Sequence, residues 1–246
     1  MSKIKLKLIS ISIFCVVVST KAEVNRGYLI IKKVDEKNKP GTAVINMEIK
    51  NISPNGEEEV QEVVILAKVD DKKNNTGRAL LRFLSPPDMK GTQVFQRKQS
   101  SFTEQYIFIP ALSKWRSVPS KSDSFFGAEL TYEDVLGRDL EDNTYELIEE
   151  NNSIFKVKAI PKSKSSYDSF ILTIDKKYNI VAVDFVKDGK LLKTFSVGKI
   201  ENIDGFDTPL NATVENLKNG RKTLMKLSQV KYEVEIPEKY LDVKIR

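Results

Sequence analysis

Hydrophobic and polar positions along this 246-residue chain follow two different periods. Near its start, Tyr28, Ile31 and Val34 recur every three residues and are followed by the breaker Lys37–Gly41. That spacing places the three side chains on one face of a helix, so the stretch predicts one amphipathic helix. Beyond Gly41 the period shortens to two, which is the period of a strand with one buried face.

The period-two segments are short and are bounded by turn signals rich in proline, glycine, asparagine and aspartate. Asp188-Gly189 predicts a tight hairpin, and Asn219-Gly220 joins the last two segments. Lysine alternates with apolar residues in Phe155-Lys156-Val157-Lys158 and marks one wet face. The pattern predicts a large antiparallel meander with strands at 42–52, 58–70, 77–87, 91–97, 104–110, 113–119, 144–150, 153–160, 169–175, 178–186, 190–197, 211–217 and 223–230.

Few helices are available to cover such a wide sheet. Besides the stretch near Tyr28, the sequence offers only a segment around Tyr132 and a turn at Glu238–Leu241. An antiparallel sheet usually covers one face and leaves the other in water, so its apolar face must be hidden by curvature. We therefore expect an α+β fold, in which a large curved antiparallel sheet forms an incomplete, half-open β-barrel capped by a few short helices.

The first residues have the pattern of a secretory signal peptide. Three of the first seven are lysine, an apolar run spans 8–18, and Ser19–Ala22 offers a small-residue cleavage site. The run is too short for a comfortable membrane span, although an uncleaved anchor is the alternative. We expect residues 1–22 to be removed and residues 23–246 to form one exported domain.

The residue types that are missing argue against an enzyme. The chain has no histidine, which is the commonest general base and metal ligand. Cys15, the only cysteine, lies inside the expected signal peptide, so the mature chain would have neither a thiol nucleophile nor a disulfide. Ser120-Lys121-Ser122 leaves a serine–lysine hydrolase as the weakest alternative. No calcium loop or phosphate-binding glycine loop is present, and we expect no metal and no cofactor.

The net charge gives no reason to expect nucleic-acid binding. The whole chain is at +6, but residues 1–22 carry four lysines and no acid. Without them the 40 basic residues fall to 36 against 34 acidic ones, which is close to neutral. We expect a monomer without a nucleic-acid partner.

The stretch from Ser120 to Val135 has two interpretations that are compatible. Thr131 and Asp134 have the spacing of a capping box, which predicts a short helix at Tyr132–Leu136. The paired aromatics before it, Phe125 and Phe126, are either core residues, worth about 1.5–3 kcal/mol each by burial, or part of a lid over a cavity under the sheet. The side chains of such a lid pack as core residues when the cavity is empty and form a binding surface when it is filled. Gly127 then supplies a backbone conformation that other residues avoid.

Three segments, "FLSPPDMKGTQVF", "YIFIPALSKWRSV" and "SFFGAELTYEDV", occur in an order and at a spacing that carry a family resemblance. In these three segments the chain resembles the outer-membrane lipoprotein-sorting proteins, the divergent group related to LolA and LolB. The motif-bearing part runs from about Arg82 to Leu136. The matching positions are Pro87, Asp88, Lys90, Gly91, Thr92, Tyr106, Pro110, Ser124, Phe125, Gly127, Tyr132, Glu133 and Asp134.

The resemblance implies a periplasmic carrier or chaperone. In such a protein a hydrophobic cavity holds a lipid, or the acyl chains of a lipoprotein, for transfer to the outer membrane. The alternative on the same fold is a periplasmic sensor or accessory module that partners an inner-membrane transporter or regulator. We expect Pro87, Asp88, Gly91, Gly127 and Asp134 to be structural motif residues.

Aromatic residues are concentrated in the motif-bearing part of the chain. We expect them to line the cavity, since they form a large share of the protein's apolar bulk within a short span. They are Phe83, Phe95, Tyr106, Phe108, Trp115, Phe125, Phe126 and Tyr132.

Overall fold

The computed structural model of the chain describes residues 25–100, 102–118 and 120–243, and the expected signal peptide lies outside them. The helical segments are α1 (Arg26–Asp35), η1 (Pro110–Leu112), α2 (Tyr132–Leu136), η2 (Leu140–Asp142) and η3 (Glu238–Tyr240). The strands are β1 (Thr42–Ile52), β2 (Glu58–Asp71), β3 (Thr76–Ser85), β4 (Gln93–Lys98), β5 (Thr103–Ile109), β6 (Lys114–Ser117), β7 (Asn143–Glu150), β8 (Ile154–Pro161), β9 (Ser169–Asp175), β10 (Ile180–Lys187), β11 (Lys190–Ile203), β12 (Phe206–Asn216) and β13 (Lys222–Tyr232).

All thirteen strands form one antiparallel sheet in the order β6-β5-β4-β3-β2-β1-β13-β12-β11-β10-β9-β8-β7. The chain begins in the middle of this sheet, since β1 pairs with β13 on one side and with β2 on the other. It runs outward to the β6 edge, crosses to the β7 edge and returns strand by strand to the middle. The predicted meander is therefore confirmed within each half and is interrupted between β6 and β7.

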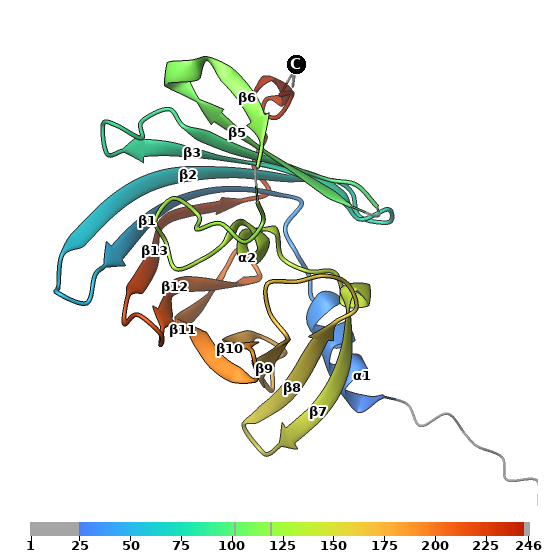
Figure 1. Cartoon of the computed structure of the whole chain (residues 1–246). Coiled ribbons are helices and arrows are strands. Elements are labelled where there is room, and N and C mark those ends of the chain that lie inside the picture. Colours follow the sequence, from blue (N-terminus) through green and yellow to red (C-terminus); the bar gives the residue numbers. More distant parts are fainter. Residues whose placement is uncertain (1–24, 101, 119, 244–246) are drawn as a thin grey trace, which may run out of the picture.

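The sheet curls strongly but does not close, because β6 and β7 do not pair (Figure 1). Figure 1 shows α2 inside the curve, between the two halves of the sheet. The expected fold class, a half-open barrel with few helices, is confirmed. Two faces follow from this shape, and we call the inner one the concave face and the outer one the convex face.

β11 and β12 are longer than the period-two pattern predicts. β11 continues to Ile203 rather than ending near Val197, and β12 begins at Phe206 rather than at Asn211. Register shifts between Val197 and Ile200 break the alternation of inward and outward side chains, so the periodic signal stops at the irregularity. The turn between the strands is Asp204-Gly205, and both residues have positive φ (52° and 87°), as in a two-residue hairpin.

α1 covers the concave face of the second half of the sheet. Asn25 caps the helix by accepting a hydrogen bond from the Tyr28 backbone N–H at 2.9 Å. Gly27 lets the helix lie close to β7, since a Cβ there would meet the Leu147 nitrogen at 2.9 Å. The core under the helix consists of Ile30, Ile31, Tyr145, Phe155, Val157, Ala159, Tyr167, Phe170, Ile174 and Phe185.

The concave face of the first half is covered by part of the crossing between the sheet edges. We call residues 120–136, which include α2, the plug. The predicted capping box of α2 is confirmed, because the Asp134 N–H donates to the Thr131 hydroxyl and the Thr131 N–H donates to the Asp134 carboxylate. The buried core under the plug consists of Ile49, Val63, Phe83, Val94, Phe125 and Tyr132.

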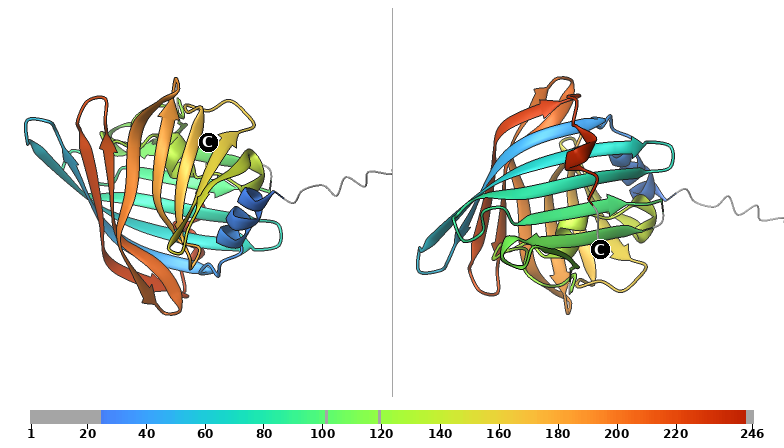
Figure 2. Two further views of the ribbon diagram at one scale, coloured as in Figure 1. Left: turned by 90° about the horizontal axis from the view of Figure 1, so that it is seen from below. Right: turned by 90° about the horizontal axis from the view of Figure 1, so that it is seen from above.

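The convex face of the first half is also covered, which the sequence pattern did not predict. Residues 233–243, which we call the strap, lie across the outside of the sheet (Figure 2, right). Ile236 and Leu241 of the strap pack against Leu80 and Phe95. One wet face, as expected from the lysine alternation, is found in the second half, where Phe155 and Val157 are buried and the neighbouring lysines are not. In the first half the strap covers only part of the convex face, since Glu62 and Arg82 remain exposed beside the buried Val63 and Phe83.

Candidate functional site

Four of the eight predicted cavity residues meet on the concave face. Phe83 projects from β3, while Phe125, Phe126 and Tyr132 come from the plug. The ring centroids of Phe83 and Phe126 lie 4.7 Å apart, and those of Phe125 and Tyr132 lie 5.2 Å apart. We call these four residues the concave cluster. They fill the space between plug and sheet with tilted and edge-to-face aromatic pairs.

The other four lie on the convex face. Phe95 pairs with Tyr106 across β4 and β5, and Phe108 pairs with Trp115 across β5 and β6. Because side chains alternate along a strand, Val94 and Ile107 take the concave positions instead. The eight aromatic side chains therefore do not line one common cavity, and lipid contact stays a prediction for the concave cluster.

The predicted motif residues lie in two tight turns. Pro87, Asp88 and Gly91 belong to the β3–β4 connection, where Gly91 has φ +85° and donates its N–H to the Phe83 carbonyl at 2.9 Å. Gly127 has φ +82° in the plug, directly after Phe126 at φ +50°. An aromatic residue rarely adopts a positive φ, so the packing of the Phe126 ring holds its backbone in an unfavourable conformation.

Asp134, the last motif residue, anchors the plug to the second half of the sheet. Its carboxylate accepts from the Lys193 ammonium at 2.5 Å and from the Tyr167 hydroxyl at 3.1 Å. The Lys193 and Asp134 side chains are only 4% and 3% exposed. Burial raises the pKa of Tyr167 above its ordinary value, so its hydroxyl stays protonated and donates. Sequence reasoning missed Lys193 and Tyr167, which no local motif connects with Asp134.

Two further acids fasten the plug. Glu133 accepts hydrogen bonds from the Ser166 N–H at 2.9 Å and from the Ser165 hydroxyl at 2.7 Å, and it pairs with Arg138. Burial works to raise the pKa of Glu133, but the hydrogen bonds from Ser166 and Ser165 hold it below its ordinary value. Glu129 pairs with Arg221 at 2.8 Å. The plug is thus held mainly by apolar contacts on the first half of the sheet, where Gln61 also donates to the Phe126 carbonyl at 3.0 Å, and by these polar contacts on the second half.

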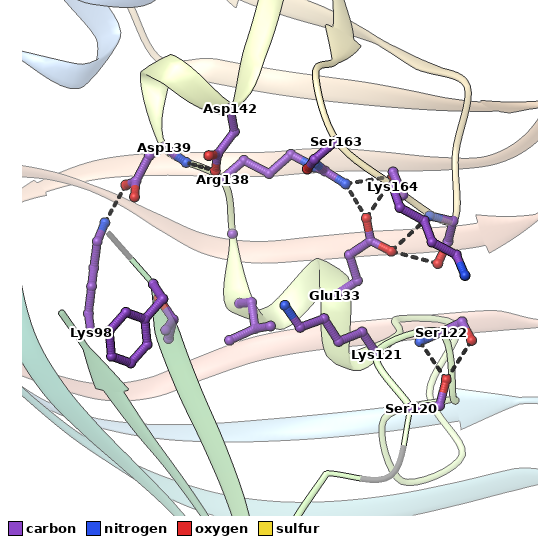
Figure 3. A pocket seen from close by; sticks show the side chains of 16 residues that line it. Lys98, Ser120, Lys121, Ser122, Glu133, Arg138, Asp139, Asp142, Ser163 and Lys164 are labelled. Carbon is purple, nitrogen blue, oxygen red and sulfur yellow. Dashed lines mark hydrogen bonds and ion pairs between the residues drawn. The ribbon is translucent and has the colours of Figure 1, made fainter. Parts of the chain in front are cut away.

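A cavity of about 800 Å³ opens beside α2, and we call it the mouth cavity. Figure 3 shows Ser120, Lys121 and Ser122 of the plug on one side of it, and Ser163 and Lys164 of the β8–β9 loop on another. Its walls are mostly polar. The chemistry of this cavity therefore suits a charged or hydrogen-bonding group rather than an acyl chain.

A smaller cavity of about 240 Å³, which we call the groove, lies on the concave face beyond α2. Ala43, Ala67 and Ala79 form part of its wall and are neighbours across β1, β2 and β3. Lys98, Thr103 and Leu136 line both cavities, which therefore adjoin.

Within 25–100, 102–118 and 120–243, no three acidic or other metal-ligating side chains gather closely enough to hold a metal ion. No helix in the same ranges is long and apolar enough to cross a membrane.

Comparisons with known proteins agree with this fold. A family model described as "Uncharacterized protein" matches residues 75–244. A DUF1329 family protein from Desulfovibrio piger is 22% identical, with a TM-score of 0.82 over 88% of this chain and 95% of that chain. A domain assigned to the outer membrane lipoprotein-sorting proteins, from Vibrio parahaemolyticus, is 21% identical, with a TM-score of 0.80 over 88% of this chain and 96% of that one.

A LolA superfamily protein from Nitrosomonas europaea is 19% identical, with a TM-score of 0.69 over 90% of this chain and 99% of that chain. No protein with a curated description matches the chain. The three structural likenesses show a LolA-like fold, and they confirm the resemblance found in the motif-bearing segments.

Proposed function

Since this chain belongs to the family whose model matches residues 75–244, and since it shares its fold with a lipoprotein-sorting domain, we propose that it carries a lipid or a lipidated protein. The cargo's acyl chain would lie on the concave face, in the place that the plug now fills. No bond is made or broken in this function, so the protein acts as a carrier or chaperone and not as an enzyme.

The observation that supports this proposal best is the construction of the plug. Its residues add no strand to the thirteen-stranded sheet, and its only bridge, between Ser124 and Thr131, is internal. The plug can therefore leave the concave face without breaking a sheet hydrogen bond. Its departure would expose the apolar side chains of β1 to β4 as a surface for cargo.

Energies of burial and association suggest a moderate affinity. An acyl chain of about fifteen methylenes gains roughly 12 kcal/mol at about 0.8 kcal/mol for each buried group. Association costs of about 4–15 kcal/mol offset much of this gain, and displacing the plug costs more. A carrier needs such a balance, because it must hold its cargo in transit and then release it.

Displacement of an apolar fluorescent probe tests this function. We expect the probe to bind the folded, delipidated protein, and long-chain lipids to displace it while chains of about six carbons do not, because buried methylenes provide the free energy. A folded protein that binds neither the probe nor any long-chain lipid would contradict the proposal.

The proposed place of work is the periplasm, which follows from the expected signal peptide at residues 1–22. Export would produce a mature chain beginning at Glu23. The intact mass of the protein from a periplasmic fraction tests this, and a mass that includes Cys15 would exclude cleavage at this site.

A further inference from the structure

We propose that the mouth cavity binds the anionic headgroup of a single-chain amphiphile, whose acyl chain enters the groove and continues into the space on the concave face that Phe125 and Phe126 of the plug now fill. This inference rests on the proposed carrier function and adds the chemical class of the cargo. It also gives a role to Ser120-Lys121-Ser122, which the concave cluster leaves without one.

The charges of the mouth cavity favour an anion. The described residues that line it carry four cationic and three anionic side chains. Arg138 pairs with Glu133 and Lys98 pairs with Asp139, while the third acid, Asp142, accepts a hydrogen bond from the Asp139 N–H at 2.8 Å. The ammonium groups of Lys121 and Lys164, in contrast, have no carboxylate within ion-pairing distance in the described part of the chain. Figure 3 shows these two lysines on different elements around the same cavity.

Hydroxyl donors accompany the two lysines. Ser120 and Ser122 lie on the plug side, and Ser163 lies on the β8–β9 loop. Ammonium and hydroxyl groups together form charge-assisted hydrogen bonds with phosphate or carboxylate oxygens. The volume of about 800 Å³ leaves room for such a headgroup with its hydration water.

The groove provides a path for the chain of the same ligand. It shares Lys98, Thr103 and Leu136 with the mouth cavity, so a headgroup bound there has an apolar opening beside it. The alanines of the groove are followed along β2 and β3, on the same face, by Ile65 and Leu81. These two residues pack against the concave cluster, so the path leads under the plug.

An unsatisfied polar group lies beside this path. Gln105 is only 8% exposed, and within the described part of the chain neither its amide nitrogen nor its amide oxygen has a hydrogen-bond partner. It pairs across the ladder with Gln96 and stands two residues from Thr103, and both of these line the groove. A buried amide without a partner is costly, and an ester or hydroxyl group of the ligand would satisfy it.

Binding of three probes to the full mature chain tests the inference. The probes are oleoyl lysophosphatidic acid, uncharged monooleoylglycerol and inorganic phosphate, each titrated below the micellar concentration where one exists. We expect the anionic lipid to bind roughly tenfold more tightly than the uncharged one. Such a ratio is what two exposed ion contacts give when each contributes up to about 1 kcal/mol. This preference should shrink as salt is added.

The double variant Lys121→Gln/Lys164→Gln should lose roughly that tenfold preference and keep its affinity for monooleoylglycerol. The matched control is Lys190→Gln/Lys218→Gln, which removes the same charge at two exposed hairpin positions outside the cavity and should behave as wild type. Far-UV spectra and melting temperatures establish that both variants are folded.

The possible outcomes separate the two proposals. Equal affinity for the charged and uncharged lipids, or an unchanged preference in the Lys121/Lys164 variant, overturns the headgroup site and leaves the carrier function standing. Inorganic phosphate that binds as tightly as the lysolipid overturns a lipid headgroup in favour of a free-anion site. Failure to bind any long-chain amphiphile overturns the carrier function itself.

Discussion

The carboxylate of Asp134 receives hydrogen bonds from three parts of the chain. One oxygen, Oδ2, accepts from the Thr131 N–H within the plug, from Tyr167 and from Lys193 of β11. The other oxygen has no partner among the residues that the structure describes. Lys193 also donates to the Glu129 carbonyl at 3.0 Å, and it lies 4.7 Å from the centroid of the Phe185 ring. This group is therefore a deeply buried polar link between the plug and the second half of the sheet.

We predict that Lys193→Met destabilises the protein by about 3–5 kcal/mol, because it leaves the Asp134 charge buried without its partner. Urea unfolding measures the loss. The control is Arg26→Met, which breaks an ion pair with Glu150 whose Arg26 side chain is 61% exposed and should cost less than about 1 kcal/mol. Equal losses in the two variants would contradict the role given to Asp134.

The depressed pKa of Glu133 predicts a loss of stability in acid. A carboxyl whose pKa is lower in the folded than in the unfolded protein stabilises the fold at pH values above its unfolded pKa, which is near 4.5. That contribution disappears as the pH falls through the folded pKa. We expect Glu133→Gln to weaken the dependence of the melting temperature on pH below about 4.5, whereas the exposed Glu235→Gln leaves it unchanged.

Thermal melts at a series of pH values measure this effect. Parallel curves for wild type and Glu133→Gln would show that the hydrogen bonds from Ser165 and Ser166 do not couple protonation of Glu133 to folding.

Only the local contacts of Glu133 and Asp134 could be predicted from the sequence. The capping box of Thr131 and Asp134 is local, and the sequence predicts it. The partners of Glu133 and Asp134 come from the β8–β9 loop and from β11, which only the fold brings close.

At the scale of elements, the strands follow the period-two pattern because alternation is imposed by one buried face. Where that condition fails, the prediction fails as well. The register shifts in β11 interrupt its alternation, so the pattern predicts too short a strand. The strap covers part of the convex face in the first half of the sheet, where the pattern predicts a face in water. The aromatic residues of β4 to β6 were assigned to one cavity because composition does not reveal which face an isolated strand turns inward.

The plug is the element whose behaviour the carrier function requires. We predict that Phe126→Gly loosens it, because the change removes a ring from the concave cluster and permits the positive φ without the ring. The loss of burial should cost no more than about 3 kcal/mol. Apolar probe binding should rise, and the amides of the plug should exchange faster.

The control for this variant is Tyr240→Gly, which removes an aromatic ring that is 48% exposed on the strap, and it should change neither quantity. Hydrogen–deuterium exchange resolved by peptide separates the plug from the sheet. If Phe126→Gly leaves the plug as protected as in wild type, or lowers probe binding, the plug is a fixed part of the core and not a lid.

At the scale of the whole molecule, the sheet separates the two cores of the concave face from the core under the strap, and the two sides should act independently. The strap covers part of the convex face, where Leu241 is fully buried and Arg78 pairs with Glu238 at 2.9 Å. The concave face carries the plug and both cavities. The open barrel could be expected from a wide sheet with few helices, but its closure by an internal plug and an external strap depends on contacts between distant segments.

We predict that Leu241→Ala lowers stability by about 2–5 kcal/mol through the cavity it leaves, yet does not alter lipid affinity. Leu191→Ala, at a position 45% exposed, is the matched control and should cost far less. Urea unfolding and lipid titration measure the two quantities. A change of lipid affinity as large as the change of stability would show that the two faces are coupled.

The central claim is that cargo and plug compete for the concave face, and hydrogen–deuterium exchange with and without a bound long-chain lipid tests it most directly. We expect lipid to accelerate exchange in residues 123–131, because the part of the plug that carries Phe125 and Phe126 leaves its place, while the paired strands β1 and β13 at the centre of the sheet stay protected. Bound lipid that leaves residues 123–131 unchanged or more protected would contradict the account.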